Sequence, residues 1–404
     1  MILYWFLATV LAITAGSLFL PKPYQLLYFS VYSPQPYIYM AVCTLAAVLG
    51  HFSLRLLPRR RAIVHLTPQV KRYLSTWYLL LLVAVAVSGV VVLLLQINAT
   101  VGLTNYFILM AASSTSAITS DIREQTIMLT SAAGGLPGFI KMFNWNSVAA
   151  PFCLLALLAR GRRIRGFLNI VLATTVGIVF LLGTVLRMDR LSSLALIPVI
   201  ASLLRRKDQR AIRWVAVAAL AVLFAGAIVE SIRRRADQGA LDWISLYLQL
   251  GTINLDLMMK SVSGHTFGLF GVFSFVDWIS RSFGVDLLRN APLFNWAWST
   301  AQNGFGYMYL DFGWAGPFIF LLMGVTAGWI DLKASQPAAG ETLWKEFQWF
   351  ACYAAASLAI VPAYRGFDFW FFIMASCACL KLEKLFSAQA SHAIPKGWSV
   401  AGSG

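Results

Sequence analysis

The sequence predicts an all-α polytopic integral membrane protein, and three observations support this fold class. First, 59% of the 404 residues are hydrophobic and only 12% are charged, whereas a soluble chain carries about 25% charged residues. Second, several uninterrupted apolar runs reach the roughly 20 residues that a helix needs to cross a hydrocarbon core. Third, much of the net charge of +16 lies in short loops between these runs, which indicates membrane topology rather than nucleic-acid binding.

We expect about ten membrane helices in one transmembrane domain that covers residues 1–386. The predicted helices span residues 2–20, 37–57, 74–95, 139–158, 167–186, 190–204, 212–230, 308–331, 346–363 and 368–386. The first of them lacks a basic leader, so we interpret it as a retained helix rather than a cleaved signal peptide. Residues 387–404 are expected to form a disordered cytoplasmic tail.

Clusters of basic residues set the expected orientation. They lie at 59–72, 160–165, 205–213 and 381–384, after the second, fourth, sixth and tenth predicted helices. With ten helices, all four clusters fall on the same side of the membrane. Because cytoplasmic loops are enriched in Lys and Arg, that side is the cytoplasm and both termini are cytoplasmic.

The segment 96–138 is the ambiguous part of this count. Its apolar portion, 101–118, is interrupted by four consecutive hydroxyl residues, Ser113 to Ser116. A full span here would turn the next basic loop outward, so we interpret it as an interfacial or re-entrant segment on the outer side. A twelve-helix arrangement is the alternative.

Residues 231–306 form the largest expected outer (periplasmic) region, which precedes the helix 308–331. The region contains six basic and five acidic residues, so its net charge is close to zero and it is not a generic basic patch. Short amphipathic helices are predicted around 241–260 and 268–283, lying at the membrane surface. The region is rich in aromatic residues, which suit either an interfacial belt or a groove for sugar rings.

Several motifs for activated-phosphate chemistry are absent. The chain has no G-x-x-x-x-G-K-[ST] loop for ATP and no Asp-x-Asp pair for a metal-held sugar nucleotide. Its histidines and cysteines are not clustered for zinc. We therefore expect no cofactor and no metal. An enzyme of this kind would need a substrate that is already activated, such as a polyprenyl-diphosphate-linked sugar.

Five arginines on the expected outer side are the conspicuous polar residues. They are Arg123, Arg187, Arg190, Arg281 and Arg365. A guanidinium binds a diphosphate through paired, charge-assisted hydrogen bonds. Arg281 is the catalytic candidate, since it could stabilise charge on a departing phosphate oxygen, and the other four are candidate diphosphate ligands. Alternatively, these side chains extend to lipid headgroups or cap helix ends.

His265 and Asp311 complete the candidate site. His265 is the sole histidine in the expected outer parts, and a histidine can accept a proton from a sugar hydroxyl near neutral pH. Its alternative role is that of a capping or interfacial residue. Asp311 is expected to begin the eighth helix, where a carboxylate suits the helix dipole, so capping is its main predicted role and catalysis the alternative. Asp256 and Asp277 are further candidate bases.

Three short elements occur in the order seen in a known enzyme family: Gly-x-Thr-aromatic, Ile-x-Arg, and an aromatic entry into a membrane helix. Their residues are Gly264, Thr266 and Phe267, then Ile279 and Arg281, then Tyr309, Phe312, Gly313 and Gly316. The segment LRMDRLSSLALI, which holds Arg187 and Arg190, is a further point of similarity. Together they resemble the Wzy-type oligosaccharide repeat-unit polymerases, and the rest of the chain resembles that family mainly in topology.

This resemblance implies a metal-independent glycosyltransferase of the bacterial inner membrane. It would transfer a growing oligosaccharide from polyprenyl diphosphate onto a lipid-linked repeat unit. The implied partners are that lipid-linked oligosaccharide, membrane lipids, and a chain-length regulator and flippase of the same pathway, with no nucleic acid. An O-antigen-ligase-like enzyme is a related alternative. A lipid-linked oligosaccharide flippase is a different class, and it would usually show internal repeats, which are absent from the sequence.

Overall fold

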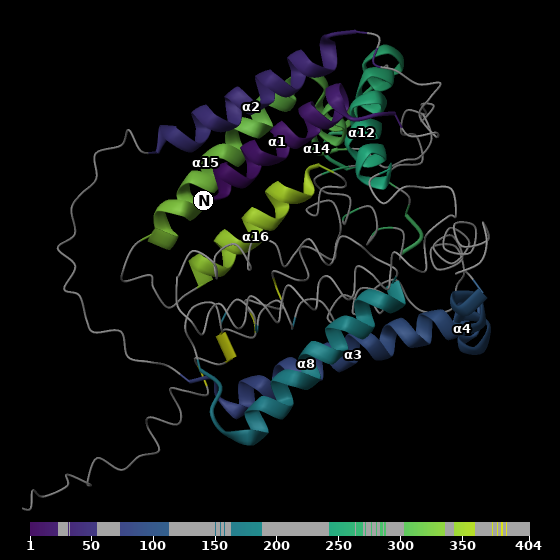
Figure 1. Cartoon of the computed structure of the whole chain (residues 1–404). Helices are drawn as coiled ribbons and strands as arrows, with labels where there is room; N and C mark the ends of the chain where they lie inside the picture. Colours follow the sequence, from purple (N-terminus) through teal and green to yellow (C-terminus); the bar gives the residue numbers. More distant parts are fainter. Residues whose placement is uncertain are drawn as a thin grey trace, which may run out of the picture.

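The computed structural model describes the following parts of the chain. They are residues 1–22, 31, 33–54, 73–112, 150, 154, 157, 163–187, 242–262, 264–269, 271, 276, 280, 283–285, 287, 303–335, 343–359, 374, 378, 381–382 and 385. The elements within them are helical, and they are shown in Figure 1. In chain order they are α1 (Ile2–Phe19), α2 (Gln35–Ser53), α3 (Thr76–Thr100), α4 (Leu103–Ala112), α8 (Gly166–Arg187), α12 (Asp242–Ser261), α14 (Gly304–Phe312), η4 (Gly313–Ala315), α15 (Gly316–Ser335) and α16 (Leu343–Ser357).

Five stretches in this described part are long and apolar enough to cross a membrane. Four are single helices, α1, α2, α3 and α8, and the fifth is the run from α14 through α15. They coincide with five of the predicted spans, and α16 coincides with a sixth. The chain thus has the character of a multi-pass membrane protein. Predicted helices 190–204 and 212–230 lie outside the described residues, and 139–158 and 368–386 are represented by isolated helical residues.

The larger group of helices comprises α1, α2, α12, α14, α15 and α16 (Figure 1). Helix α2 packs along α15, while α1 lies against α12 and α16. Their apolar side chains form one core that includes Phe6, Tyr39, Phe305 and Phe320. The rings of Phe305 and Phe320 stack with centroids 5.0 Å apart. Aromatic stacking therefore joins α14 to α15 inside this core.

Glycines bring α2 and α15 into close contact. A Cβ atom at Gly324 would run into the backbone carbonyl of Ala47, and one at Gly50 would run into that of Leu321. Gly328 faces α2 in the same way, with 2.6 Å between its would-be Cβ and a carbonyl oxygen. These glycines therefore allow the two helices to approach closely, because only a residue without a side chain fits at this separation.

The smaller group pairs α3 with α8 in parallel. A backbone bridge joins Tyr73 to Arg163 just before the two helices begin, and Thr76 donates a hydrogen bond of 2.9 Å to Asn169. Two helices that start side by side must run in the same direction. The predicted topology requires this, since each of them follows a basic loop on the same side.

Helix α4 turns back against the far end of α8. Gly102, at φ 82°, allows the turn after α3, and the buried Tyr106 hydroxyl donates to the carbonyl of Leu186. Burial raises the pKa of Tyr106 far above its usual value, so the phenol keeps its proton as a donor. The described part of α4 has 10 residues, or about 15 Å, and the residues after Ala112 lie outside the described part of the chain, so the interfacial or re-entrant segment at 101–118 stays a prediction.

The predicted position of the helix around 241–260, at the membrane surface, is wrong. The helix exists as α12, but its polar side is buried rather than laid on the membrane surface. Ser245 donates to the carbonyl of Pro21 at 2.6 Å, and Gln249 donates to the same carbonyl at 3.0 Å. The polar residues that gave the sequence its amphipathic pattern thus bind the chain that leaves α1.

The predicted helix 308–331 is also not one helix. Gly313, at φ 56° and ψ −135°, ends α14, and after one 3-10 turn α15 begins at Gly316. Helix α15 has 20 residues, which corresponds to about 30 Å and suffices to cross a bilayer by itself. Helix α14 is therefore a separate element, and every residue from Gly304 to Asp311 is buried.

Candidate functional site

The candidate site lies where α14 ends and α15 begins. The chain leaves α12 and continues into residues 264–271, which lie against the last turn of α14 through hydrogen bonds from Thr266, Phe267 and Gly271. We call this segment the 264–271 loop; residues 264–269 and 271 of it are described. It contains the first element of the family resemblance, and the end of α14 contains the third, so the fold brings these two elements together.

Asp311 anchors the loop. Its carboxylate is fully buried and accepts a hydrogen bond of 2.5 Å from the Thr266 hydroxyl and one of 2.8 Å from the Gly271 amide. A Cβ atom at Gly271 would run into this carboxylate. The prediction that Asp311 begins a helix is wrong, because it lies in the last turn of α14. Its donors come from a loop rather than from a helix start, so in this structure the Asp311 carboxylate fastens the loop to α14.

The loop backbone also satisfies the end of α14. The Thr266 amide donates to the Leu310 carbonyl at 3.3 Å, and the Phe267 amide donates to the Asp311 carbonyl at 2.9 Å. The last four carbonyls of a helix have no partner within the helix itself. The loop supplies partners for two of them, which fixes its position on α14 through both backbone and side chain.

His265 is held in one orientation by this arrangement. Its Nδ1 lies 3.3 Å from the Leu310 carbonyl oxygen. A carbonyl can only accept, so Nδ1 carries a hydrogen, and in the neutral imidazole the lone pair is then on Nε2. The ring meets Tyr309 edge to face, with centroids 6.0 Å apart, and it packs so closely on Gly313 that a Cβ there would run into Nε2. The residue as a whole is exposed, while its Nε2 faces Gly313.

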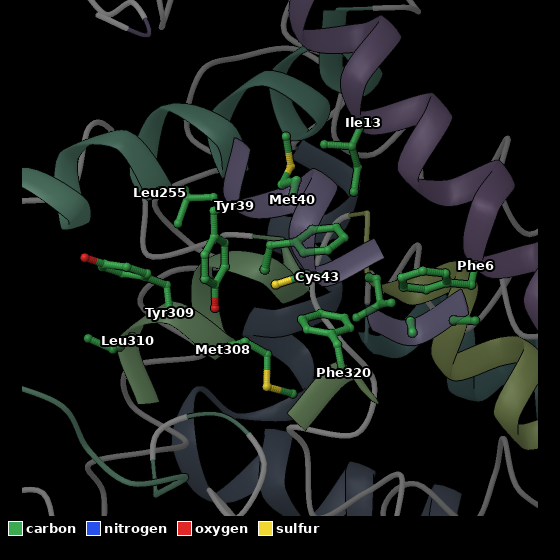
Figure 2. Packing of buried hydrophobic residues seen from close by; sticks show 14 of the residues in the cluster. Phe6, Ile13, Tyr39, Met40, Cys43, Leu255, Met308, Tyr309, Leu310 and Phe320 are labelled. Carbon is green, nitrogen blue, oxygen red and sulfur yellow. The ribbon is translucent and has the colours of Figure 1, made fainter. Parts of the chain in front are cut away.

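Aromatic side chains continue from His265 across the helix break. Tyr39 of α2 donates a hydrogen bond of 3.2 Å to the Gly313 carbonyl, and its ring meets those of Tyr309 and Trp314 edge to face at 5.3 Å and 5.5 Å. Figure 2 shows Tyr39 and Tyr309 together at the edge of the hydrophobic core, with the Tyr309 hydroxyl directed away from it. Trp314 is 56% exposed. At the helix break, Tyr39 of α2 thus binds the backbone, and the side chain of Trp314 is exposed.

Asp256, a further candidate base, has a structural role. It is fully buried and binds the Ser33 hydroxyl at 2.6 Å and the Lys260 ammonium at 2.7 Å. These contacts join α12 to the segment before α2 and occupy the carboxylate. The other candidate, Asp277, lies outside the described residues.

The predicted arginines are not placed by the structure. Arg123, Arg190, Arg281 and Arg365 lie outside the described residues. Arg187 is the last residue of α8, and its side chain is likewise outside them. The structure therefore brings together His265 and Asp311 of the predicted site and leaves the arginines as predictions.

Two residues of this site were missed by the sequence reasoning. Tyr39 lies within an apolar helix, where a tyrosine gives no signal of a contact across the fold. Gly271 was one of several glycines in the loop, and only its amide bond to Asp311 distinguishes it.

Within the described residues, no three His, Cys, Asp or Glu side chains lie together as a metal site would require. No protein-family model, curated protein or solved structure matches the chain.

Proposed function

We propose that this protein is a glycan polymerase that acts on polyprenyl-diphosphate-linked oligosaccharides at the outer face of the inner membrane. The acceptor hydroxyl oxygen forms a bond to the anomeric carbon of the donor glycan. The bond from that carbon to the diphosphate breaks, and polyprenyl diphosphate leaves with the electron pair. The proton of the acceptor hydroxyl passes to a base. The donor is already activated, so the reaction needs no nucleotide.

The observation that carries this proposal is the orientation and exposure of His265. A general base needs a lone pair, an accessible position and a fixed direction. The Leu310 carbonyl fixes the tautomer, Gly313 leaves room for the ring, and the side chain is exposed. Because Asp311 holds the loop that carries it, we assign the base to His265 and a positioning role to Asp311.

The diphosphate would be bound by the arginines that the sequence places on the same side. Arg187 follows the carbonyl that Tyr106 binds, at the end of α8 away from the basic loops. Arg123, Arg190, Arg281 and Arg365 enter the proposal from the sequence alone. A bidentate contact depends on the planar guanidinium, so replacement by Lys should reduce polymer even though the charge remains.

A flippase is the second candidate, because transporters commonly have a broken helix at the substrate site. The break at Gly313 is such a feature. Here, however, α15 alone has the 20 residues that a crossing needs, which would put the break at one end of the span rather than at its middle. That position suits chemistry at the surface better than alternating access.

The lipid-linked intermediate in a deletion strain separates the two functions. Loss of a polymerase leaves single lipid-linked repeat units on the outer face, whereas loss of a flippase retains them on the inner face. We expect the first outcome.

Purified protein given lipid-linked repeat units should also lengthen glycan without ATP, sugar nucleotide or divalent metal. Retention on the inner face, or a strict requirement for nucleotide, would exclude the proposed reaction.

The His265→Ala variant tests the site itself. It should insert into the membrane at a normal level, bind lipid-linked substrate and make no polymer. The matched control is His51→Ala, which removes the buried histidine at the opposite end of the α2–α15 pair. That variant should still make polymer of normal length. Normal polymer from His265→Ala would show that the base lies elsewhere.

A further inference from the structure

The tip of the 264–271 loop is a tight turn with an unusual residue in it. The Leu269 amide donates to the Thr266 carbonyl at 3.1 Å, which closes the turn. The two central residues, Phe267 and Gly268, have φ values of 49° and 92°. Positive φ at both central positions is the pattern of a type I′ turn, in which Asn, Asp or Gly is the usual first residue. Here that residue is a phenylalanine.

A bulky side chain is unfavourable in the left-handed region, because Cβ approaches the following carbonyl. Of the non-glycine residues that the structure describes, Phe267 alone has positive φ. Its side chain is 79% exposed, so burial does not compensate for the strain. A strained residue persists where its surroundings hold it, and such residues cluster at ligand sites.

The surroundings of Phe267 hold it firmly. Its own amide binds the Asp311 carbonyl, and the preceding Thr266 binds the Asp311 carboxylate. The backbone that carries the ring is therefore held in place on α14, two residues beyond His265. Contact with fluid lipid does not require a fixed position, whereas contact with a substrate does.

Phe283 provides an internal comparison. It is equally exposed, at 81%, and like Phe267 it is followed by a glycine of positive φ. Its own φ is not positive, and its amide bonds to Ser280 within the same turn at 2.9 Å. Of two exposed Phe-Gly turns in one segment, only the one beside His265 is both strained and fastened to α14.

On the basis of the proposed polymerase function, we infer that Phe267 and Trp314 form the aromatic walls of a subsite for the acceptor sugar. Trp314 follows Gly313, which packs against the imidazole, and it is itself half exposed. Phe267 follows His265 by two residues, and the Trp314 ring meets that of Tyr309, which in turn meets the His265 ring. The C–H face of a pyranose ring packs on such rings, which leaves its hydroxyl edge free to meet Nε2.

The first test is the Phe267→Asn variant, which suits the turn better than the native residue. Its melting temperature in detergent should equal or exceed that of the wild type. In vesicles containing lipid-linked repeat units, however, its KM for the acceptor should rise by about tenfold or more. Phe267→Tyr, which keeps an aromatic ring, should behave like the wild type. Phe283→Asn is the matched control and should change KM by less than about twofold.

The second test does not depend on activity. The Phe267→Trp variant should change its fluorescence, relative to wild type, when free repeat-unit oligosaccharide from the strain's own polysaccharide is added. Lipids brominated along the acyl chain should quench it weakly. Strong quenching by these lipids without a response to saccharide would show that the ring contacts lipid, and would overturn the inference.

The outcomes separate this inference from the proposed function. If the wild type lengthens glycan and Phe267→Asn does so with unchanged KM, the subsite is wrong and the polymerase proposal stands. If the wild type does not lengthen glycan, the polymerase proposal fails, and the saccharide response of Phe267→Trp still decides whether sugar binds at this turn. A Phe267→Leu variant as active as Phe267→Tyr would also overturn the inference, since a lipid contact tolerates any apolar side chain.

Discussion

Two buried aspartates lie near the two ends of the α14–α15 run, and their partners differ. Asp331, in the last turns of α15, accepts from the Met1 ammonium at 2.8 Å and from Gln348 at 2.6 Å, with His51 Nε2 at 3.8 Å. Asp311, at the end of α14, binds a hydroxyl and a backbone amide of one loop. The first carboxylate joins side chains and a terminus from four helices; the second holds a turn.

This difference shows that burial alone does not define what a carboxylate does. Asp331 connects α15 to α1, α2 and α16, so its loss should weaken the assembly of helices. Asp311 fixes the position of His265 and Phe267 on α14, so its loss should leave the helices assembled and disorder the site. Stability and glycan synthesis should therefore respond separately to changes at the two positions.

The largest expected effect is that of Asp311→Ala on polymer. The change leaves the Thr266 hydroxyl and Gly271 amide without their acceptor, so the loop should leave α14. Since a displacement of about 1 Å can reduce a rate by about a hundredfold, polymer per unit of protein should fall by about that factor. Gel analysis of polysaccharide measures it, and a protease should cut the loop faster. Asp331→Ala is the control and should retain polymer; equal loss in both variants would contradict the division of roles.

The next largest effect should be on the close contact between α2 and α15. In Gly324→Ala, the new methyl group meets the Ala47 carbonyl, and overpacking of this kind destabilises by about 1–3 kcal/mol. The melting temperature in detergent should fall. Gly177 of α8 has open space around its would-be Cβ, so Gly177→Ala should be neutral or stabilising by about 0.5–1 kcal/mol. The same sign for both variants would disprove the close-contact argument.

A smaller effect is expected from Asp331→Asn. The amide still offers an oxygen to Gln348 but loses the charge that attracts the Met1 ammonium and His51. One partner is partly exposed, at 23%, so we expect a loss of about 1–2 kcal/mol in the free energy of unfolding. Thermal unfolding in one detergent measures this loss. Polymer length should be normal, and shortened chains would show that this end also influences the site.

The smallest effect is expected at Thr266, which contributes one of the two bonds to the Asp311 carboxylate. Thr266→Val removes the hydroxyl at nearly constant shape and should favour opening of the loop by about 1 kcal/mol, or about fivefold. Proteolysis of the loop under native conditions measures this opening. Thr266→Ser keeps the hydroxyl and should match the wild type. If Ser and Val behave alike, the hydroxyl does not hold the loop.

The sequence predicted the spans well because their signal is local. An apolar run of sufficient length is enough to identify α1, α2, α3 and α8, and basic loops indicated the parallel direction of the last two. The break at Gly313 was missed because a glycine inside an apolar run is common in membrane helices. Gly313 contacts Tyr39 and His265, which come from distant parts of the chain.

The site was predicted in part, for a similar reason. His265 could be selected as the sole histidine in the expected outer parts, and a resemblance placed Thr266 and Phe267 beside it. The role of Asp311 could not be deduced, because its partners lie 40 and 45 residues away in sequence. The polar face of α12 was assigned to the membrane surface because a periodic pattern does not reveal which partner covers it.

The close contact between α2 and α15 has a consequence for how the protein is made. Tyr39 of α2 and Gly313, just before α15, are 274 residues apart. At about 5–20 residues per second, translation of this interval takes on the order of 15–55 s. During that time the face of α2 that carries Gly50, with His51 next to it, is in the bilayer before α15 has been made. A nascent chain arrested before α15 should therefore be a substrate for membrane chaperones and quality-control proteases, and one arrested after α16 should resist them.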